Sequence, residues 1–249
     1  GPTTLSEVFG YYGESTSPND IAPKLFIPSK EGSLQLEMVS ATRQFGFLPY
    51  TERGTLSSIM SLVKDDIPVI VFQNLSIQLF PQWHYAVVIG FDSDKGTVTL
   101  HTGLTPNHEM SLELFERTWG RGNYWYLAPV PPNVTSSEMK PFTYISAAFD
   151  MLKVGDKSRA LAFLETASRT WPSYWLSYFL IGNHYLEQDD DQAITWFKKG
   201  YEVGQHQHAY VHNYVLALRK NNKPEEASTI LKQGLEHFPN NEALLSLKN

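Results

Sequence analysis

The sequence predicts an α+β domain over residues 1–130, followed by an all-α array of helix pairs over residues 141–249. Short β-like runs separated by turns dominate the first part, whereas helical patterns continue through the second. Residues 131–137 contain two prolines followed by small polar residues, which is typical of a linker. We therefore expect residues 131–140 to connect two domains, and a cut near Ser136 to leave two soluble halves.

The α+β domain is expected to begin with helices. Residues 2–12 predict the first, because proline is tolerated in an opening turn. Ser33 is expected to cap a second helix over residues 34–45, which Gly46 would stop. A third helix is predicted over residues 56–64.

Strands are expected after these helices, because the pattern changes to short β-branched and aromatic runs. A turn over residues 92–96 should join two of the strands in a hairpin. The predicted strands are residues 68–72, 84–91, 97–101 and 124–127.

Composition excludes several function classes. No apolar run reaches the roughly 20 residues that a membrane span needs, so no transmembrane segment is expected. The sequence opens without a basic and then apolar leader. Its net charge is −6, with no basic cluster, which argues against a nucleic-acid partner. It contains no cysteine, so disulfides and thiolate metal sites are excluded within these residues, and we expect no cofactor.

The histidines of the chain do not form the pattern of a metal site. His206, His208 and His212 lie close together in the sequence, but no cysteine or well-spaced carboxylate completes a metal site. His108 and Glu109 lack the second histidine of a zinc-protease helix. We therefore expect no metal.

A repeat organises the second part of the chain. Ala160, Ala193 and Ala227 are 33 and 34 residues apart. Small residues are needed where two helices of a pair touch closely, and one helix pair cannot bury its apolar face alone, so such pairs stack. Each alanine is followed by a large and then a small residue, in two cases with a proline five residues later: Leu164, Ala167 and Pro172; Phe197 and Gly200; Leu231, Gly234 and Pro239.

This pattern resembles the tetratricopeptide repeat, with three copies over residues 141–240 and the start of a capping helix at residues 242–247. An unrelated helical bundle is the alternative. The resemblance implies a solenoid whose first helices bind a protein or peptide segment in a concave groove. The groove-facing positions would be Phe142, Ile145, Phe149, Phe179, Asn183, His212 and Arg219.

Two segments of the first part resemble a peptidase family. Residues 1–5 read GPTTL, which is similar to the end of the motif Cys-Gly-Pro-x-x-Leu. Residues 67–71 read IPVIV and residues 83–92 read WHYAVVIGFD, a Pro-led strand and a His-led strand ending in Gly-aromatic-Asp. Together they resemble the papain-like bacteriocin-processing (double-glycine leader) cysteine peptidases.

The resemblance implies a site. A cysteine would stand immediately before Gly1, at a helix N-terminus that lowers the pKa of a thiol. His84 would be its general base, although a lone histidine on a strand is more often structural. The aspartate that orients this histidine in the family is replaced by Thr102 or His101, and a threonine cannot stabilise an imidazolium as a carboxylate does. Gly1 and Pro2 could instead be the scar of a cleaved expression tag.

Three functions therefore remain open. The first is a cysteine peptidase, or an acyl-transfer relative, whose repeats recruit a protein or peptide partner. The second is a degenerate peptidase-like domain that binds without cutting, and the third is a scaffold in which the repeats act alone. Bacterial proteins that combine these two domains are typically exported to the periplasm or anchored as lipoproteins, so the resemblance implies that location. As it stands, the sequence has no thiol with which to react.

Overall fold

The structure, a computed structural model, describes residues 1–25, 33–77, 79–103 and 105–248. It contains two compact units, and helix α6 (Pro141–Val154) contributes residues to both. The division by contacts thus falls within α6, later than the predicted connection at residues 131–140. The first unit is Gly1–Ala147 with Val154–Asp156, and the second is Ala148–Lys153 with the chain from Lys157 onward.

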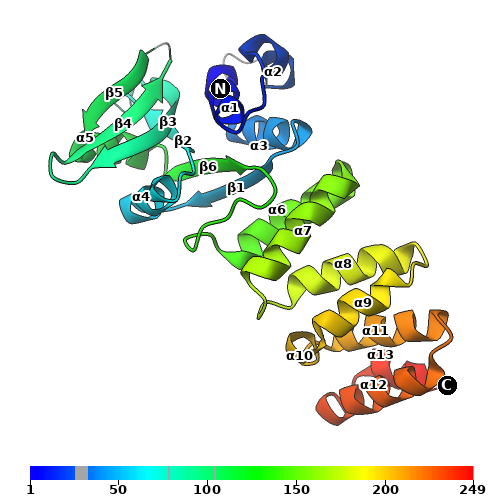
Figure 1. Cartoon of the computed structure of the whole chain (residues 1–249). Coiled ribbons are helices and arrows are strands. Elements are labelled where there is room, and N and C mark those ends of the chain that lie inside the picture. Colours follow the sequence, from blue (N-terminus) through cyan, green and yellow to red (C-terminus); the bar gives the residue numbers. More distant parts are fainter. Residues whose placement is uncertain (26–32, 78, 104, 249) are drawn as a thin grey trace. The chain divides into compact units, whose positions relative to one another are not determined.

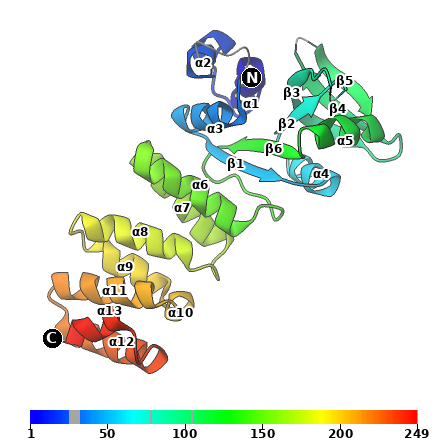
Figure 2. The same cartoon turned by 180° about the vertical axis from the view of Figure 1, so that it is seen from behind.

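A six-stranded sheet forms the centre of the first unit, in the order β1-β6-β2-β3-β4-β5, and every neighbouring pair is antiparallel. Figures 1 and 2 show β1 beside β6 from both sides of the sheet. The strands are β1 (Leu48–Arg53), β2 (Val69–Asn74), β3 (Trp83–Asp92), β4 (Thr97–Thr102), β5 (Thr105–Ser111) and β6 (Trp125–Val130).

Three helices gather at the N-terminus, as Figure 1 shows, and they bury one face of this sheet. Apolar residues of α1, α2 and α3 form one core cluster with residues of β2, β3 and β6, including Ile70, Tyr85 and Leu127. These three side chains lie on the same face because side chains alternate along a strand. The helices of the first unit before α6 are α1 (Pro2–Tyr11), α2 (Pro18–Leu25), α3 (Gln35–Gln44), α4 (Leu56–Lys64) and α5 (Leu112–Arg121).

Helix α5 packs against the other face of β2. Gln73, which points away from the neighbouring Phe72, donates a buried 2.8 Å hydrogen bond from Nε2 to Oγ1 of Thr118. The helix ends at Gly122, where an added Cβ would lie 1.9 Å from the carbonyl oxygen of Phe72. Only glycine therefore lets the end of α5 approach β2 this closely.

Most of the predicted elements of this unit are confirmed. The helices expected over residues 2–12 and 56–64 are α1 and α4, and the four expected strands are β2, β3, β4 and β6. The turn over residues 92–96 is also present, since Oδ1 of Asp92 accepts bonds from the N–H groups of Asp94 and Lys95. Ser33 as a helix cap was wrong: the N-cap of α3 is Leu34, which makes no side-chain bond.

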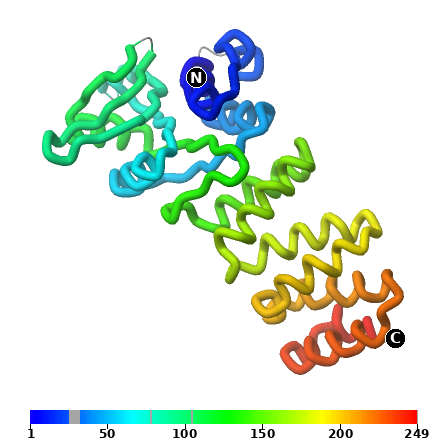
Figure 3. Tube along the Cα trace, in the orientation of Figure 1, coloured from blue at the N-terminus to red at the C-terminus, as the bar shows by residue number. Residues whose placement is uncertain are grey.

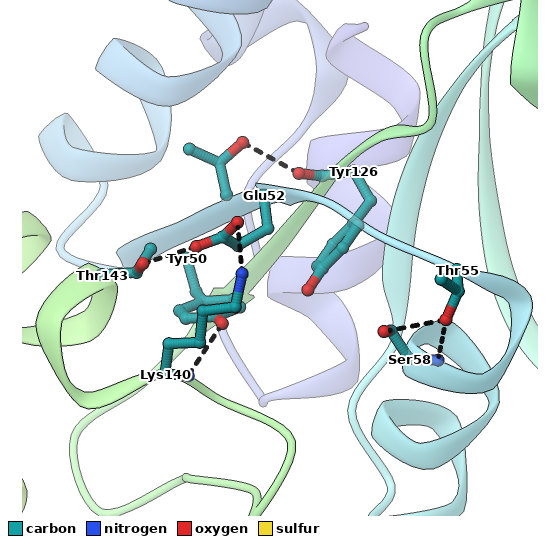
Figure 4. A network of polar contacts seen from close by, with 8 residues as sticks. Tyr50, Glu52, Thr55, Ser58, Tyr126, Lys140 and Thr143 are labelled. Atoms are coloured by element: carbon teal, nitrogen blue, oxygen red, sulfur yellow. Dashed lines mark hydrogen bonds and ion pairs between the residues drawn. The ribbon is translucent and has the colours of Figure 1, made fainter.

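The segment after β6 is bonded to the sheet domain instead of hanging free. Oγ of Ser136 donates a 2.5 Å bond to Oδ2 of Asp65, beyond the end of α4. The N–H of Lys140 donates to the hydroxyl of Tyr50 at 2.9 Å. Glu52 then accepts from Nζ of Lys140 at 3.1 Å and from Oγ1 of Thr143 at 2.5 Å, as Figure 4 shows. The start of α6 is therefore fixed to β1.

The second unit is helical. Successive helices reverse direction, as the tube in Figure 3 shows from α7 to α12. Helix α8 contacts α9 and α7, and α11 contacts α12, α9 and α8. After α6 come α7 (Lys157–Thr170), α8 (Leu176–Glu187), α9 (Gln192–Lys199), α10 (Tyr201–Gly204), α11 (His208–Lys220), α12 (Pro224–His237), α13 (Glu242–Leu245) and the 3₁₀ turn η1 (Ser246–Lys248).

Small residues allow these helices to approach each other. The periodic alanines Ala160, Ala193 and Ala227 are all buried. A Cβ on Gly200 would lie 2.5 Å from Tyr178 and from the hydroxyl of Tyr210. Gly200 is therefore a point of close contact between helices. Among the described helices, none is both long and apolar enough to cross a membrane.

Candidate functional site

A cavity of about 430 Å³ brings the start of α1 together with the start of β3. Gly1 and His84, which are 83 positions apart in the sequence, both line it. The cavity also carries apolar surface from Leu34, Phe72 and Trp83. Tyr85, the next inward residue of β3, donates a 3.1 Å bond to the carbonyl of Ser33 and so ties the segment before α3 to the sheet.

The N-terminus of α1 gives this cavity a positive electrostatic character. Gly1 is the N-cap, Pro2 occupies the first turn, and no acidic residue stands there to neutralise the unpaired N–H groups. A Cβ on Gly1 would lie 2.4 Å from Oγ of Ser33, so glycine is required at this crowded position.

His84 is held in place by one neighbour on β4. Its Nε2 and Oγ1 of Thr102 are 2.7 Å apart, which is a short hydrogen bond. Partial burial lowers the pKa of His84 below its usual 6.5. The imidazole is therefore neutral near pH 7, and its Nδ1 makes no hydrogen bond to the residues that the structure describes.

His101 occupies a different place from Thr102, because consecutive residues of a strand point to opposite faces. Its Nδ1 accepts a 3.2 Å bond from the N–H of Asn107. The side chain lines a second cavity of about 300 Å³, together with Tyr11 and Ile89. Of the two residues that the sequence offered as the partner of His84, the structure brings Thr102 to the imidazole and leaves His101 elsewhere.

Sequence reasoning missed three side chains near the site. Phe72 and Trp83 stack at 4.8 Å with an interplanar angle of 8°, and both line the cavity with His84. Alternation on β2 and β3 identified them only as strand residues. Glu7 on α1 lies close to Gly1 and to His101, and burial, the largest cause, raises its pKa.

Residues 1–124 match the model of the Peptidase_C39 like family. A crystal structure of a protein from Bacillus anthracis, described as a C39-like peptidase, aligns with the chain at a TM-score of 0.44 and 15% identity, covering 55% of this chain and 88% of that one. The search of curated proteins gave no match.

Residues 1–124 of the first unit are thus similar to the peptidase C39-like family. The family match ends before β6, so it includes the elements that carry Gly1, His84 and Thr102. Within the part of the chain that the structure describes, no group of three or more histidine, aspartate or glutamate side chains is placed to hold a metal ion.

The residues predicted to line a groove lie outside the C39-like site and differ in exposure. Phe142 is exposed, Ile145 is fully buried, and Phe149 contacts Nζ of Lys153 at 4.2 Å from its ring centre. Burial removes Ile145 from any surface that a partner could touch. Phe179 is packed in the helical core, where it stacks on Tyr210 at 5.9 Å.

Polar groove positions are connected by hydrogen bonds. Nδ2 of Asn213 donates to Oδ1 of Asn183 at 2.8 Å, and Oδ1 of Asn213 lies 2.9 Å from Nδ1 of His212. The structure therefore brings Asn183 and His212 together through a residue that the sequence did not single out. Arg219 is elsewhere, with its guanidinium bonded to the carbonyl of Leu247.

Proposed function

We propose that the protein is a cysteine peptidase of the C39-like type, with a cysteine immediately preceding Gly1 as nucleophile and His84 as general base. One observation carries this: Gly1 at the N-terminus of α1 and His84 on β3 line the same cavity. A thiol just before Gly1 would benefit from the unpaired N–H groups of α1, which favour the thiolate.

The reaction follows from this placement. Nδ1 of neutral His84 takes the thiol proton while Nε2 stays on Thr102. The thiolate attacks the peptide carbonyl carbon, and the imidazolium then returns the proton to the amine that leaves. Water hydrolyses the resulting thioester, with His84 accepting a proton from the water and the cysteine recovering its thiol. Thr102 holds the ring in place but adds no negative charge to stabilise the imidazolium.

The test is alkylation of a protein that includes the residue before Gly1. Iodoacetamide followed by mass spectrometry should modify a cysteine at that position near neutral pH. Replacing His84 with alanine should slow this alkylation, because the pKa of the thiol then rises toward the free value of ~8.5. The matched control is His101→Ala, which removes a histidine from the other cavity and should leave the rate unchanged. The proposal is wrong if the residue before Gly1 is not a cysteine, or if the alkylation rate is the same in wild type and His84→Ala.

A second function is favoured by Thr102. Without a carboxylate beside His84, the same cavity suits a domain that binds a peptide and does not cut it. A peptide that binds with measurable affinity but stays uncleaved in the presence of an intact thiol would support this alternative.

We further propose that the second unit is an array of tetratricopeptide repeats that binds a protein or peptide segment. The support is the 33- and 34-residue spacing of the buried alanines and the amide network of Asn183 and Asn213. A side-chain amide can pair with both the N–H and the C=O of an extended peptide. Pull-down with wild type and with Asn183→Ala tests this, and Lys199→Ala, whose ammonium lies over the ring of Trp196, is the control. Identical partner lists for wild type and Asn183→Ala would show that the proposed groove does not bind the partner.

A further inference from the structure

An apolar loop, defined here by residues 75–77 and 79–82 together with Trp83, the first residue of β3, lies between β2 and His84. Its sequence, LSIQLFPQW, contains no charged residue. Its large apolar side chains are exposed: Leu79 is 77% accessible, Phe80 71% and Trp83 49%. Exposed apolar surface of this kind is uncommon on a protein without a ligand or partner for it.

The two ends of the apolar loop are held by a regular set of hydrogen bonds. The N–H of Leu75 donates to the carbonyl of Gln82 at 2.9 Å. Oδ1 of the buried Asn74 accepts from the N–H groups of Ser76 at 3.0 Å and of Gln82 at 2.9 Å. Arg121, at the end of α5, donates from Nη1 to the carbonyls of Asn74 and Ser76. Trp83 is therefore presented by an anchored backbone.

Trp83 joins the apolar loop to the candidate active site. It stacks on Phe72 at 4.8 Å, and Phe72 in turn contacts Tyr85, a member of the core cluster, at 4.8 Å. Trp83 and Phe72 also line the cavity that contains His84. A ligand positioned at His84 is thus beside the exposed edge of an aromatic stack supported by the core.

The chemistry of the cavity selects an uncharged ligand. Among its described lining residues there is no aspartate, glutamate, lysine or arginine. Beside Trp83 and Phe72, a charged side chain would lose water without gaining an oppositely charged side chain as a partner. An aromatic or large aliphatic side chain would instead exchange water for Trp83, Phe72 and Leu34.

We infer that Trp83 and Phe72 form a subsite for an aromatic or large aliphatic side chain of a peptide bound next to His84, and that Trp83 determines this selectivity. The inference deepens the proposed function. It requires only one part of that function, namely that the cavity binds a peptide. Trp83 belongs both to the apolar loop and to the lining of the cavity that contains His84. This shared residue favours a peptide over a lipid surface as the ligand.

Fluorescence anisotropy with labelled hexapeptides tests it. The probes are Ala-Ala-Phe-Ala-Ala-Ala and the same peptide with lysine or glutamate in place of phenylalanine. Wild type should bind the phenylalanine probe at least about tenfold more tightly than the two charged probes. Trp83→Ala should remove most of this preference, and Trp83→Phe should retain it within about threefold, because a phenyl ring still stacks on Phe72. Leu114→Ala, which truncates an exposed leucine on α5, should change nothing.

Equal affinity for the three probes, or an unchanged preference in Trp83→Ala, would overturn the inference. A second arm uses vesicles of phosphatidylcholine with phosphatidylglycerol. If the double variant Leu79→Ser and Phe80→Ser loses vesicle binding while peptide selectivity is absent, the apolar loop contacts lipid and the inference is wrong.

Cleavage is scored separately from binding, so that two failures remain distinct. Selective binding without cleavage by a protein that contains the cysteine removes the peptidase proposal and leaves the subsite. Cleavage of all three probes at equal efficiency removes the subsite and leaves the peptidase.

Discussion

His84 and Thr102 face each other across the β3–β4 pair, with 2.7 Å between Nε2 and Oγ1. The register pairs Thr102 with Ala86, so this contact is diagonal across the two strands. A hydroxyl in this position fixes the orientation of the ring and leaves its charge unsupported. The electrostatic consequence can be measured directly.

Replacing Thr102 with aspartate should raise the pKa of His84. A carboxylate within hydrogen-bond distance stabilises the protonated ring and opposes the effect of burial, which lowers the pKa in the parent protein. The chemical shift of the His84 ring protons, followed by NMR from pH 5 to 8, reports the change. Thr102→Asn supplies an acceptor without charge and should leave the titration close to that of the parent. An unchanged titration in Thr102→Asp would mean that the two side chains do not remain in contact in solution.

Acid should destabilise the domain through the same histidine. Because the folded pKa of His84 is lowered, the unfolded state binds its proton more readily as pH falls below ~6.5. The neutral His84 ring therefore contributes its full share to the free energy of unfolding above that pH, and this share is lost as the pH falls. Urea unfolding at pH 7.5 and 5.5 should show a larger loss of stability for the parent than for His84→Gln, which has no ring to protonate. Equal losses would assign the pH dependence to other groups.

Glu52 should contribute measurably to the stability of the first unit. Its carboxylate, 20% exposed, accepts from both Lys140 and Thr143. Glu52→Ala should therefore lower the free energy of unfolding by about 1–2 kcal/mol. The control is Lys95→Ala, which breaks an exposed pair with Asp92 and should leave the free energy of unfolding almost unchanged. Similar small losses in both variants would show that the bonds to α6 are not maintained.

A cut at Ser136 should damage the first unit, contrary to what its linker-like composition suggests. A fragment of residues 1–136 lacks Lys140 and Thr143, and it also lacks the buried Tyr144 and Ile145. A fragment of residues 1–156 retains all of them. Thermal unfolding should give a lower midpoint for the shorter fragment, by at least about 4 °C if ~2 kcal/mol is lost. Matching midpoints would restore residues 131–140 as an independent linker.

Gly200→Ala should destabilise the helical unit by about 1–3 kcal/mol, because the new methyl group would meet Tyr178 and Tyr210 at 2.5 Å. Gly10 in α1 is the matched control, since no atom lies within 4 Å of its added Cβ. Gly10→Ala should stabilise the protein by about 0.5–1 kcal/mol through helix propensity. Circular dichroism with urea measures both. A neutral Gly200→Ala would show that the helix contact can relax.

Strands could be predicted where the sequence carries a run of apolar residues, and not where pairing with a neighbouring strand decides the conformation. Both β2 and β6 are buried almost throughout, and their apolar composition identifies them as strands. By contrast β5, an edge strand, is nearly all exposed and polar, so its sequence resembles a loop. β1 starts with Leu48 and Pro49 and ends in charged residues, and its strand conformation depends on pairing with β6.

The candidate site shows the same division. Gly1 and His84 could be singled out because each belongs to a short motif with a chemical reason. The choice between His101 and Thr102 could not be made, since it depends on which face of β4 meets His84. Phe72 and Trp83 come from different strands, and only their pairing in the fold turns two ordinary aromatic residues into one surface.

The close approach of Gly122 to the carbonyl of Phe72 connects the end of α5 to a residue that lines the cavity. Arg121 and Gly122 together fix the end of β2 and the start of the apolar loop, yet neither belongs to the described cavity lining. A larger side chain at Gly122 would have to displace the backbone of Phe72, the residue on which Trp83 stacks, while every lining residue stayed the same. Directed evolution of peptide preference could therefore begin at the C-terminal turn of α5, without touching the residues proposed for chemistry.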